Sequence, residues 1–162
     1  MPVSVGIGYD SHRFSEGRPL ILGGVRIPFE KGLSGHSDAD VLTHAVIDAI
    51  LGASGLGDIG EIFPDTDPAW EGADSIDLLR TVIGMTRGSV INVDATLICE
   101  EPKLGPHRPA MVARLAESTG SRVSVKATTN EGMGWVGRGE GIACMAVATV
   151  ETGQDGPGTS TG

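Results

Sequence analysis

The chain has 162 residues, about the length of one domain. Its 12 lysine and arginine residues are outnumbered by 21 aspartate and glutamate residues, and the net charge of −9 argues against binding to nucleic acid or to anionic membranes. The 40% of hydrophobic residues excludes a disordered chain, and no apolar run approaches the roughly 20 residues of a membrane span. The N-terminus lacks the pattern of a secretion signal and only two cysteines are present, so we expect a cytoplasmic protein.

The first part of the chain predicts strands followed by a helix. Residues 3–9 alternate as a strand does, and the pair Gly23-Gly24 predicts a β-hairpin. Apolar residues then recur at helical spacing up to about Ser54. We expect Ser37 or Asp38 to cap the start of this helix.

The rest of the chain predicts a long loop, two helices and three strands. Glycine, proline and aspartate crowd residues 55–72, which predicts the loop. The other expected elements are a helix over 74–86, a strand over 90–99, a helix over 107–119 with Pro109 in its first turn, and strands over 123–128 and 142–150. Because no regular βαβ repeat occurs, we expect an α+β fold with helices on one face of a mixed sheet. We expect one domain over residues 1–151 and a disordered tail over residues 152–162.

Three residues form a candidate metal site. Asp10 and His12 are two positions apart at the end of the first predicted strand, so their side chains share a face. His44 on the first predicted helix could supply a third ligand, and this set suits zinc with one coordination position open. The alternative is a surface ion pair between Asp10 and His12. Asp48, one helical turn after His44, could orient the His44 ring or be a solvated carboxylate.

Two segments near the first helix could bind phosphate or sugar groups. The helix start offers free N–H groups beside His36, although its residues could serve only as caps. Asp58, Asp65 and Asp67 could accept hydrogen bonds from polyol hydroxyls, or simply form turns. The segment GLGDIG formally matches a dinucleotide fingerprint, but it follows a helix instead of a strand, so we reject that site.

Two later loops could bind a nucleotide. Lys103 lies in a loop after a predicted strand, where backbone groups could contact a base and the ammonium could meet phosphate. Thr128, Thr129 and Glu131 end another predicted strand and suit a polyphosphate with its Mg²⁺. By themselves these residues are also compatible with ordinary surface loops.

The glycine-rich segment GMGWVGRGEG allows close backbone approach and exposes Trp135. In the alternative interpretation, Arg138 and Glu140 in this segment only form a surface ion pair. The two cysteines, Cys99 and Cys144, lie in predicted strands, and we expect them in the core.

Together these motifs resemble one enzyme family, the 2-C-methyl-D-erythritol 2,4-cyclodiphosphate synthases. The resemblance covers residues 3–150 and is carried by GIGYDSHRF, GHSDADVLTHAVIDAILGASGLGDIGEIFPDTDP, EEPKLGPH and VKATTNEGMGWVGRGEGIA. It implies a homotrimeric lyase of non-mevalonate isoprenoid biosynthesis, with active sites between subunits. The implied reaction converts 4-diphosphocytidyl-2-C-methyl-D-erythritol 2-phosphate to the 2,4-cyclodiphosphate and CMP, because the 2-phosphate attacks the β-phosphate of the same molecule.

The resemblance also implies metal ligands and site residues. Asp10, His12 and His44 match ligands of one Zn²⁺ per chain, and Glu131 matches a contact to Mg²⁺ or Mn²⁺ held with the substrate phosphates. The positions that match transition-state stabilisers are His36 and Thr129. The positions that match substrate contacts are Asp10, Ser11, His12, His36, Ser37, Asp58, Ile59, Gly60, Phe63, Pro64, Asp65, Thr66, Asp67, Cys99, Glu100, Glu101, Pro102, Lys103, Leu104, Gly105, Thr128, Thr129, Asn130, Glu131, Trp135 and Arg138.

The implied partners are the cytidine diphosphate substrate, two further copies of the chain and an isoprenoid diphosphate on the trimer axis. We expect no fused cytidylyltransferase. Three positions depart from the residues common in the family: Ala39 replaces glycine, Glu101 replaces a neutral residue and Trp135 replaces phenylalanine. Two other functions stay open, a zinc phosphohydrolase that activates water and a trimeric nucleotide-binding regulator without zinc.

Overall fold

The computed structural model describes residues 2–153, which form an α+β fold around one main sheet. The strands of this sheet are β1 (Val3–Ser15), β4 (Gly32–Leu33), β5 (Gly88–Ile98), β6 (Arg122–Thr128) and β7 (Gly141–Thr152). Their spatial order is β4-β1-β7-β5-β6, and only β5 and β6 are parallel neighbours, so the sheet is mixed as predicted. The predicted hairpin is present as β2 (Leu20–Leu22) and β3 (Val25–Ile27).

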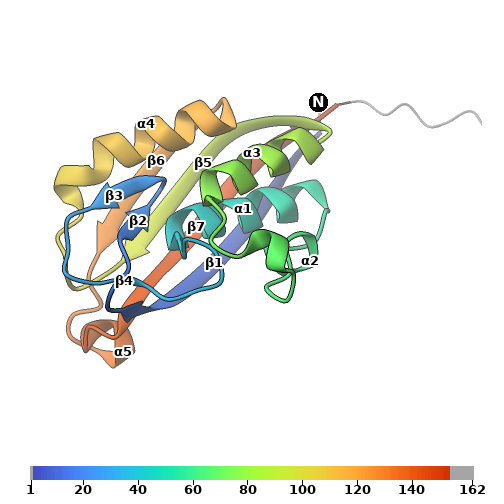
Figure 1. Cartoon of the computed structure of the whole chain (residues 1–162). Helices are drawn as coiled ribbons and strands as arrows, with labels where there is room; N and C mark the ends of the chain where they lie inside the picture. The colour runs from blue at the N-terminus through green and yellow to red at the C-terminus, as the bar shows by residue number, and fades with distance from the viewer. Residues whose placement is uncertain (1, 154–162) are drawn as a thin grey trace, which may run out of the picture.

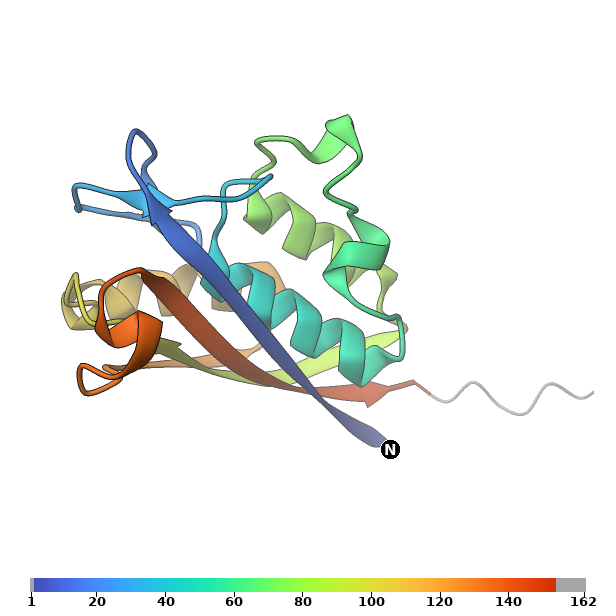
Figure 2. The same cartoon turned by 90° about the horizontal axis from the view of Figure 1, so that it is seen from below.

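The longer helices pack on one face of the sheet, as predicted (Figure 1). α1 (Val41–Ser54) lies on β1 and β7, α4 (Arg108–Thr119) lies on β6, and α3 (Ser75–Met85) packs against both helices. Figure 2 shows the opposite face of the sheet without a helix. Shorter turns are α2 (Ile59–Ile62), α5 (Gly134–Gly137) and the 3-10 segments Pro68–Trp70 and Gly105–His107. In the described part of the chain, none of the helices has the length and apolarity that crossing a membrane requires.

Two glycines let α1 lie directly on β1. A Cβ atom at Gly8 would overlap the carbonyl oxygen of Ala45, and one at Gly6 would overlap that of Ala49. The backbones of strand and helix therefore touch, which no residue with a side chain at these two positions allows. Because side chains alternate along a strand, the even-numbered residues of β1 face α1 and the odd-numbered residues face away.

The strands β1 and β7 extend beyond their predicted ends. β1 continues to Ser15, because it pairs first with β7 and then with β4, so Asp10 and His12 lie inside the strand instead of at its end. β7 ends at Thr152, so the first residue of the predicted tail belongs to the sheet. The predicted disorder of residues 154–162 concerns positions outside the described residues.

α1 begins later than predicted, at Val41, and its N-cap is Asp40. The Asp40 carboxylate accepts hydrogen bonds from the amide of Thr43 at 2.9 Å and from its hydroxyl at 2.7 Å. The predicted caps, Ser37 and Asp38, lie in the preceding loop. Serine and aspartate are both good caps, so the local sequence could not choose among the three residues.

The same carboxylate fastens the β2–β3 hairpin to α1. Asp40 is fully buried and also accepts hydrogen bonds from the amides of Gly23 at 2.9 Å and Gly24 at 2.8 Å. The first turn of α1, residues 41–43, is buried beneath these contacts. The anion site predicted at this helix start beside His36 is therefore wrong, because a ligand cannot reach the helix N-terminus.

The predicted loop over residues 55–72 contains two helical turns. Asp58 caps α2 by accepting a hydrogen bond from the amide of Glu61, and Asp67 caps the next turn through the amide of Ala69, both at 2.9 Å. Aspartate is a favoured N-cap, so Asp58 and Asp67 could have predicted these two helical turns. The density of glycine and proline in the segment led to the prediction of a loop instead.

The uncovered face of the sheet is apolar over β1 and β7. Large side chains remain exposed there, namely Val3, Val5, Ile7, Tyr9, Met145 and Val147. The strand register places Ile7 beside Val147 and Tyr9 beside Met145, so they form one continuous surface, which we call the apolar face. Toward β6 the same side of the sheet becomes polar, with an ion pair between Asp94 and Lys126. A continuous apolar surface of this kind marks contact with another molecule.

We expect Gly8→Ala to destabilise the fold, because its Cβ would push α1 away from β1. Overpacking of this kind costs about 1–3 kcal/mol, which corresponds to a fall in Tm of roughly 3–10 °C. Thermal unfolding followed by circular dichroism measures it. Gly84→Ala in α3 is the control, because its Cβ would meet nothing within 4 Å and alanine favours a helix. Equal melting temperatures for Gly8→Ala and wild type would contradict the close-packing account.

Candidate functional site

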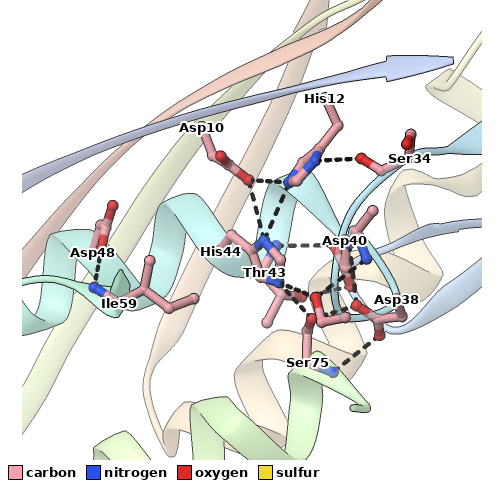
Figure 3. Close-up of polar contacts among 12 residues, drawn as sticks. Asp10, His12, Ser34, Asp38, Asp40, Thr43, His44, Asp48, Ile59 and Ser75 are labelled. Carbon is pink, nitrogen blue, oxygen red and sulfur yellow. Dashed lines mark hydrogen bonds and ion pairs between the residues drawn. The ribbon is translucent and has the colours of Figure 1, made fainter. Parts of the chain in front are cut away.

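Three side chains that can bind a metal converge between β1 and α1 (Figure 3). Oδ2 of Asp10 lies 2.8 Å from Nε2 of His12 and 3.2 Å from Nδ1 of His44. The two nitrogens are 3.4 Å apart. His44 is buried, and Asp10 and His12 are half-buried. The structure thus brings together the three predicted metal ligands, which we call the metal cluster.

The geometry of the metal cluster fits a tetrahedral ion. A zinc ion with bonds of about 2.0–2.1 Å keeps its ligand atoms about 3.3 Å apart. The three separations in the cluster span 2.8–3.4 Å. One carboxylate and two imidazoles form a three-ligand set that leaves a fourth position for a substrate or water.

A backbone carbonyl fixes the orientation of His12. Nδ1 of His12 lies 2.8 Å from the carbonyl oxygen of Ser34, which can only accept a hydrogen bond. Nδ1 therefore carries the ring proton, and Nε2 presents its lone pair to the cluster. Metal-binding histidines are usually held by such a second contact.

The electrostatics of the cluster favour a cation. Burial raises the pKa of Asp10, but hydrogen bonds and charge from His12 and His44 outweigh it, so this pKa lies below its ordinary value. Burial lowers the pKa of His12, but the hydrogen bond and charge of Asp10 outweigh it, so this pKa lies above its ordinary value. A bound metal ion would supply positive charge that neutralises Asp10.

The second ring nitrogen of His44 contacts two hydroxyls. Its Nε2 lies 2.7 Å from Oγ of Ser75 and 3.1 Å from Oγ of Ser37. Asp48, considered as a partner of this ring, instead accepts a hydrogen bond from the amide of Ile59 at 2.8 Å and joins α1 to α2. Burial raises the pKa of Asp48. The sequence contained no signal for Ser75, which lies on another helix, 31 positions after His44.

His36 is held between two parts of the chain. Its Nε2 lies 3.0 Å from the carbonyl oxygen of Asp67, so it donates to the loop predicted to hold the sugar. Arg18, which sequence reasoning missed, donates to the carbonyls of Gly35 at 2.7 Å and Ser37 at 2.6 Å, on either side of His36. His36 is thereby placed beside the predicted sugar-binding loop.

Most predicted sugar-binding residues in that loop are accessible. The exposed or half-buried ones are Asp58, Ile59, Gly60, Pro64, Asp65, Thr66 and Asp67. Phe63 differs, because its ring is buried against Trp70 with ring centroids 4.9 Å apart. Its side chain therefore belongs to the packing of the loop.

A second group of predicted site residues surrounds a cavity of about 270 Å³ at the ends of β5 and β6. The lining residues include Cys99, Pro102, Lys103, Leu104, Gly105, Thr128 and Thr129. Glu101 is exposed beside them, and its carboxylate lies 3.8 Å from the ammonium of Lys103. The carboxylate of Glu100 accepts hydrogen bonds from the amides of Asn130 at 2.7 Å and Gly132 at 3.4 Å. Glu100 therefore ties together the two loops that form the cavity.

Two further predicted site residues, Glu131 and Trp135, differ in their surroundings: Glu131 has an unusual backbone conformation, and Trp135 lines a cavity. Glu131 has a φ of 54°, a conformation that is unfavourable for a side chain of this size and that is common at functional sites. Its amide donates to Oγ1 of Thr129 at 3.2 Å. Trp135 lines a cavity of about 250 Å³ together with Ser11 and His12.

Arg138 pairs with Glu140 in the glycine-rich segment. Nε of Arg138 lies 2.6 Å from a carboxylate oxygen of Glu140, as the alternative interpretation expected. Both side chains are largely exposed, so the pair contributes little to stability.

Within one chain, the metal cluster and the cavity at β5 and β6 are separate. The register aligns Ser11, Ala143, Ile98 and Thr128 in one row across β1, β7, β5 and β6. Neighbouring strands lie about 4.8 Å apart, so Ser11 and Thr128 are separated by about 14 Å. Among the described residues, no hydrogen bond or ion pair joins the two groups, and His36 and Thr129 fall in different groups.

Known proteins share this sequence and fold. Residues 3–151 match the YgbB family. A 2-C-methyl-D-erythritol 2,4-cyclodiphosphate synthase of Symbiobacterium thermophilum is 58% identical over 152 residues, which are 90% of this chain and 97% of that protein. A solved structure of a 2C-methyl-D-erythritol-2,4-cyclodiphosphate synthase in a CDP-bound form is 39% identical, with a TM-score of 0.83 over 91% of this chain and 99% of that chain. The bifunctional IspDF of Campylobacter jejuni is 42% identical with a TM-score of 0.90; the match covers 94% of this chain and 43% of that longer one. The chain therefore belongs to the YgbB family and to its 2-C-methyl-D-erythritol 2,4-cyclodiphosphate synthases, as the motifs predicted.

Proposed function

We propose that this chain performs the cyclisation of its family with the metal cluster at the reaction centre. The activity follows from family membership: 4-diphosphocytidyl-2-C-methyl-D-erythritol 2-phosphate is converted to the 2,4-cyclodiphosphate and CMP in isoprenoid biosynthesis. The observation that supports the role of the cluster is the convergence of Asp10, His12 and His44 within 4.8 Å. We take zinc as the ion, because a three-ligand set of this chemistry suits it.

The reaction requires positioning and charge neutralisation rather than a protein nucleophile. An oxygen of the 2-phosphate forms a bond to the β-phosphorus, and the bond from that phosphorus to the bridging oxygen of CMP breaks. When bound, a zinc ion supplies positive charge to a phosphate oxygen. Burial raises the pKa of Cys99 to about 12, so its thiol is not an available nucleophile.

The cavity at β5 and β6 is our proposed nucleotide pocket. A relative of this chain was solved in a CDP-bound form, and the cavity combines backbone groups, an apolar floor and Lys103. Glu131, exposed at its edge, would hold Mg²⁺ or Mn²⁺ together with substrate phosphates, which matches the preference of Mg²⁺ for few protein ligands. Thr129 and His36 would contact phosphate groups from opposite sides.

We propose a homotrimer in which neighbouring subunits complete each active site. Two observations support it: Ser11, between two ligands of the metal cluster, and Thr128 of the nucleotide pocket lie about 14 Å apart within one chain, and the apolar face has no cover among the described residues. An isoprenoid diphosphate on the trimer axis and a cytoplasmic location stay predictions from the sequence. The similarity to synthases favours cyclisation over a phosphohydrolase or a regulator.

Phosphorus NMR tests the proposed reaction. Zinc-loaded protein, the cytidyl substrate and Mg²⁺ should yield the cyclic diphosphate and equimolar CMP, and a chelator should stop the reaction. A linear phosphate product would indicate the phosphohydrolase, because water would then be the nucleophile. Absence of turnover by folded, metal-loaded protein would favour the regulator.

We expect His44→Ala to lose bound zinc and to lower kcat by more than about 100-fold, because two ligands cannot hold the ion. Metal content per chain after dialysis and steady-state kinetics measure both effects. His107→Ala is the matched control, because this histidine lies at the start of α4 outside the metal cluster. A His44→Ala protein with full zinc content and activity would refute the proposed ligand set.

Ile7→Glu should convert the proposed trimer to monomers, because it places a charge at the centre of the apolar face. Sedimentation velocity gives the oligomeric state. Met85→Glu changes another exposed apolar residue, on α3, and should leave the trimer intact. A monomeric wild-type protein, or a trimeric Ile7→Glu protein, would contradict this assembly.

A further inference from the structure

His44 takes part in a chain of contacts that leads away from the metal cluster. Its Nε2 lies 2.7 Å from Oγ of Ser75, the first residue of α3. Ser75 is fully buried, so water cannot substitute for its hydroxyl. The same hydroxyl is hydrogen-bonded to a carboxylate oxygen of Asp38 (Figure 3). The order of contacts is therefore Asp38, Ser75, His44 and then the rest of the cluster.

The hydrogen-bonding capacity of each group fixes the protons along this chain. The Asp38 carboxylate only accepts, and it also accepts from the amides of Ser75 at 2.9 Å and Asp40 at 3.1 Å. The single hydroxyl proton of Ser75 therefore points to Asp38. The Ser75 oxygen is left as an acceptor for Nε2 of His44, so this contact favours the ring proton on Nε2 and a free lone pair on Nδ1. In the zinc-free protein the Asp10 carboxylate, 3.2 Å from Nδ1, also only accepts and favours a proton on Nδ1, so the two contacts compete.

The hydroxyl of Ser37, which also lies near Nε2 of His44, does not determine which ring nitrogen carries the proton. Its Oγ lies 3.1 Å from Nε2 of His44 and accepts from the amide of Ala39 at 3.3 Å. The Ser37 hydroxyl proton has no carboxylate acceptor, so the hydroxyl can donate to Nε2 or accept from it. Of the two hydroxyls, only that of Ser75 favours the proton on Nε2, which is the tautomer that zinc binding through Nδ1 requires.

We propose that Ser75 and Asp38 are positioning residues that hold His44 with its proton on Nε2 and its Nδ1 lone pair ready for a cation. This inference rests on the metal centre of the proposed function and adds to it two residues outside the ligand set. A ring with its proton on Nδ1 cannot bind the ion through that atom. Loss of such an outer partner typically weakens metal binding by about 10–100-fold.

The tautomer of His44 can be measured in zinc-free wild-type protein. Long-range ¹H–¹⁵N NMR spectra, recorded where the ring is neutral, give the share of each tautomer. In Ser75→Ala the share with the proton on Nδ1 should rise, because Nε2 loses its acceptor while the Asp10 carboxylate still accepts from Nδ1. In Asp38→Asn, the new amide can donate to Ser75, whose proton then turns toward Nε2, so the opposite tautomer should gain. Equal tautomer shares in wild type and in Ser75→Ala would overturn the proposal.

Zinc affinity tests the consequence for metal binding, by competition against a chelator. Ser75→Ala and Asp38→Asn should each bind Zn²⁺ about 10–100-fold more weakly, and the double variant should be no weaker than the weaker single one, because both act through one contact. Ser75→Thr keeps a hydroxyl and should restore most of the affinity. Ser118→Ala is the matched control, since this buried serine donates only to the carbonyl of Arg114 at 2.8 Å.

The outcomes separate this proposal from the proposed function. Folded Ser75→Ala with wild-type zinc affinity would overturn the positioning role. Asp74, the N-cap of α3, stays in place in this variant, so α3 should still form, and circular dichroism checks it. If wild-type protein binds no zinc, the proposed metal centre fails instead, and the tautomer measurement still decides whether Ser75 and Asp38 orient the ring.

Discussion

The backbone contact between β1 and α1 is the constraint on which the site depends. Gly6 and Gly8 remove the side chains that would separate strand from helix, so α1 lies against the strand. The next residues on this face of β1 are Asp10 and His12, and the close approach brings His44 to them at hydrogen-bonding distance. Fold stability and metal geometry therefore share one cause, and a change at the glycines disturbs both.

The short loop before α1 supplies polar groups in three directions. Asp40 turns back to the β2–β3 hairpin, Asp38 reaches α3, and Ser37 faces His44. Ala39, between them, has a φ of 57°, a conformation that favours glycine, the residue that the family resemblance led us to expect at this position. The loop can satisfy so many partners because its backbone turns sharply, and each carboxylate is matched by several donors. Carboxylates buried without such donors would be costly.

An acidic protein that acts on a polyphosphate has to overcome repulsion between like charges. The net charge of −9 works against substrate binding, and the positively charged side chains near the proposed site are few. Lys103 lines the proposed nucleotide pocket, and Arg138 is occupied by Glu140. In the proposed function, bound cations at the metal cluster and at Glu131 would supply positive charge to the substrate phosphates and would leave the remaining surface acidic.

The sequence by itself determined the elements and the ligand types, because both depend on local pattern. Alternation in β1 put Asp10 and His12 on one face, helical spacing identified α1, and the motif order identified the family. The tertiary structure decided which groups meet. Ser75 reaches His44 from a different helix, and Asp40 is the cap because the hairpin amides lie beside it. Two strands, β7 and β5, lie between β1, which carries two ligands of the metal cluster, and β6 at the cavity. These contacts join residues far apart in the chain, so no local pattern encodes them, and only the packing of helices on the sheet brings them together.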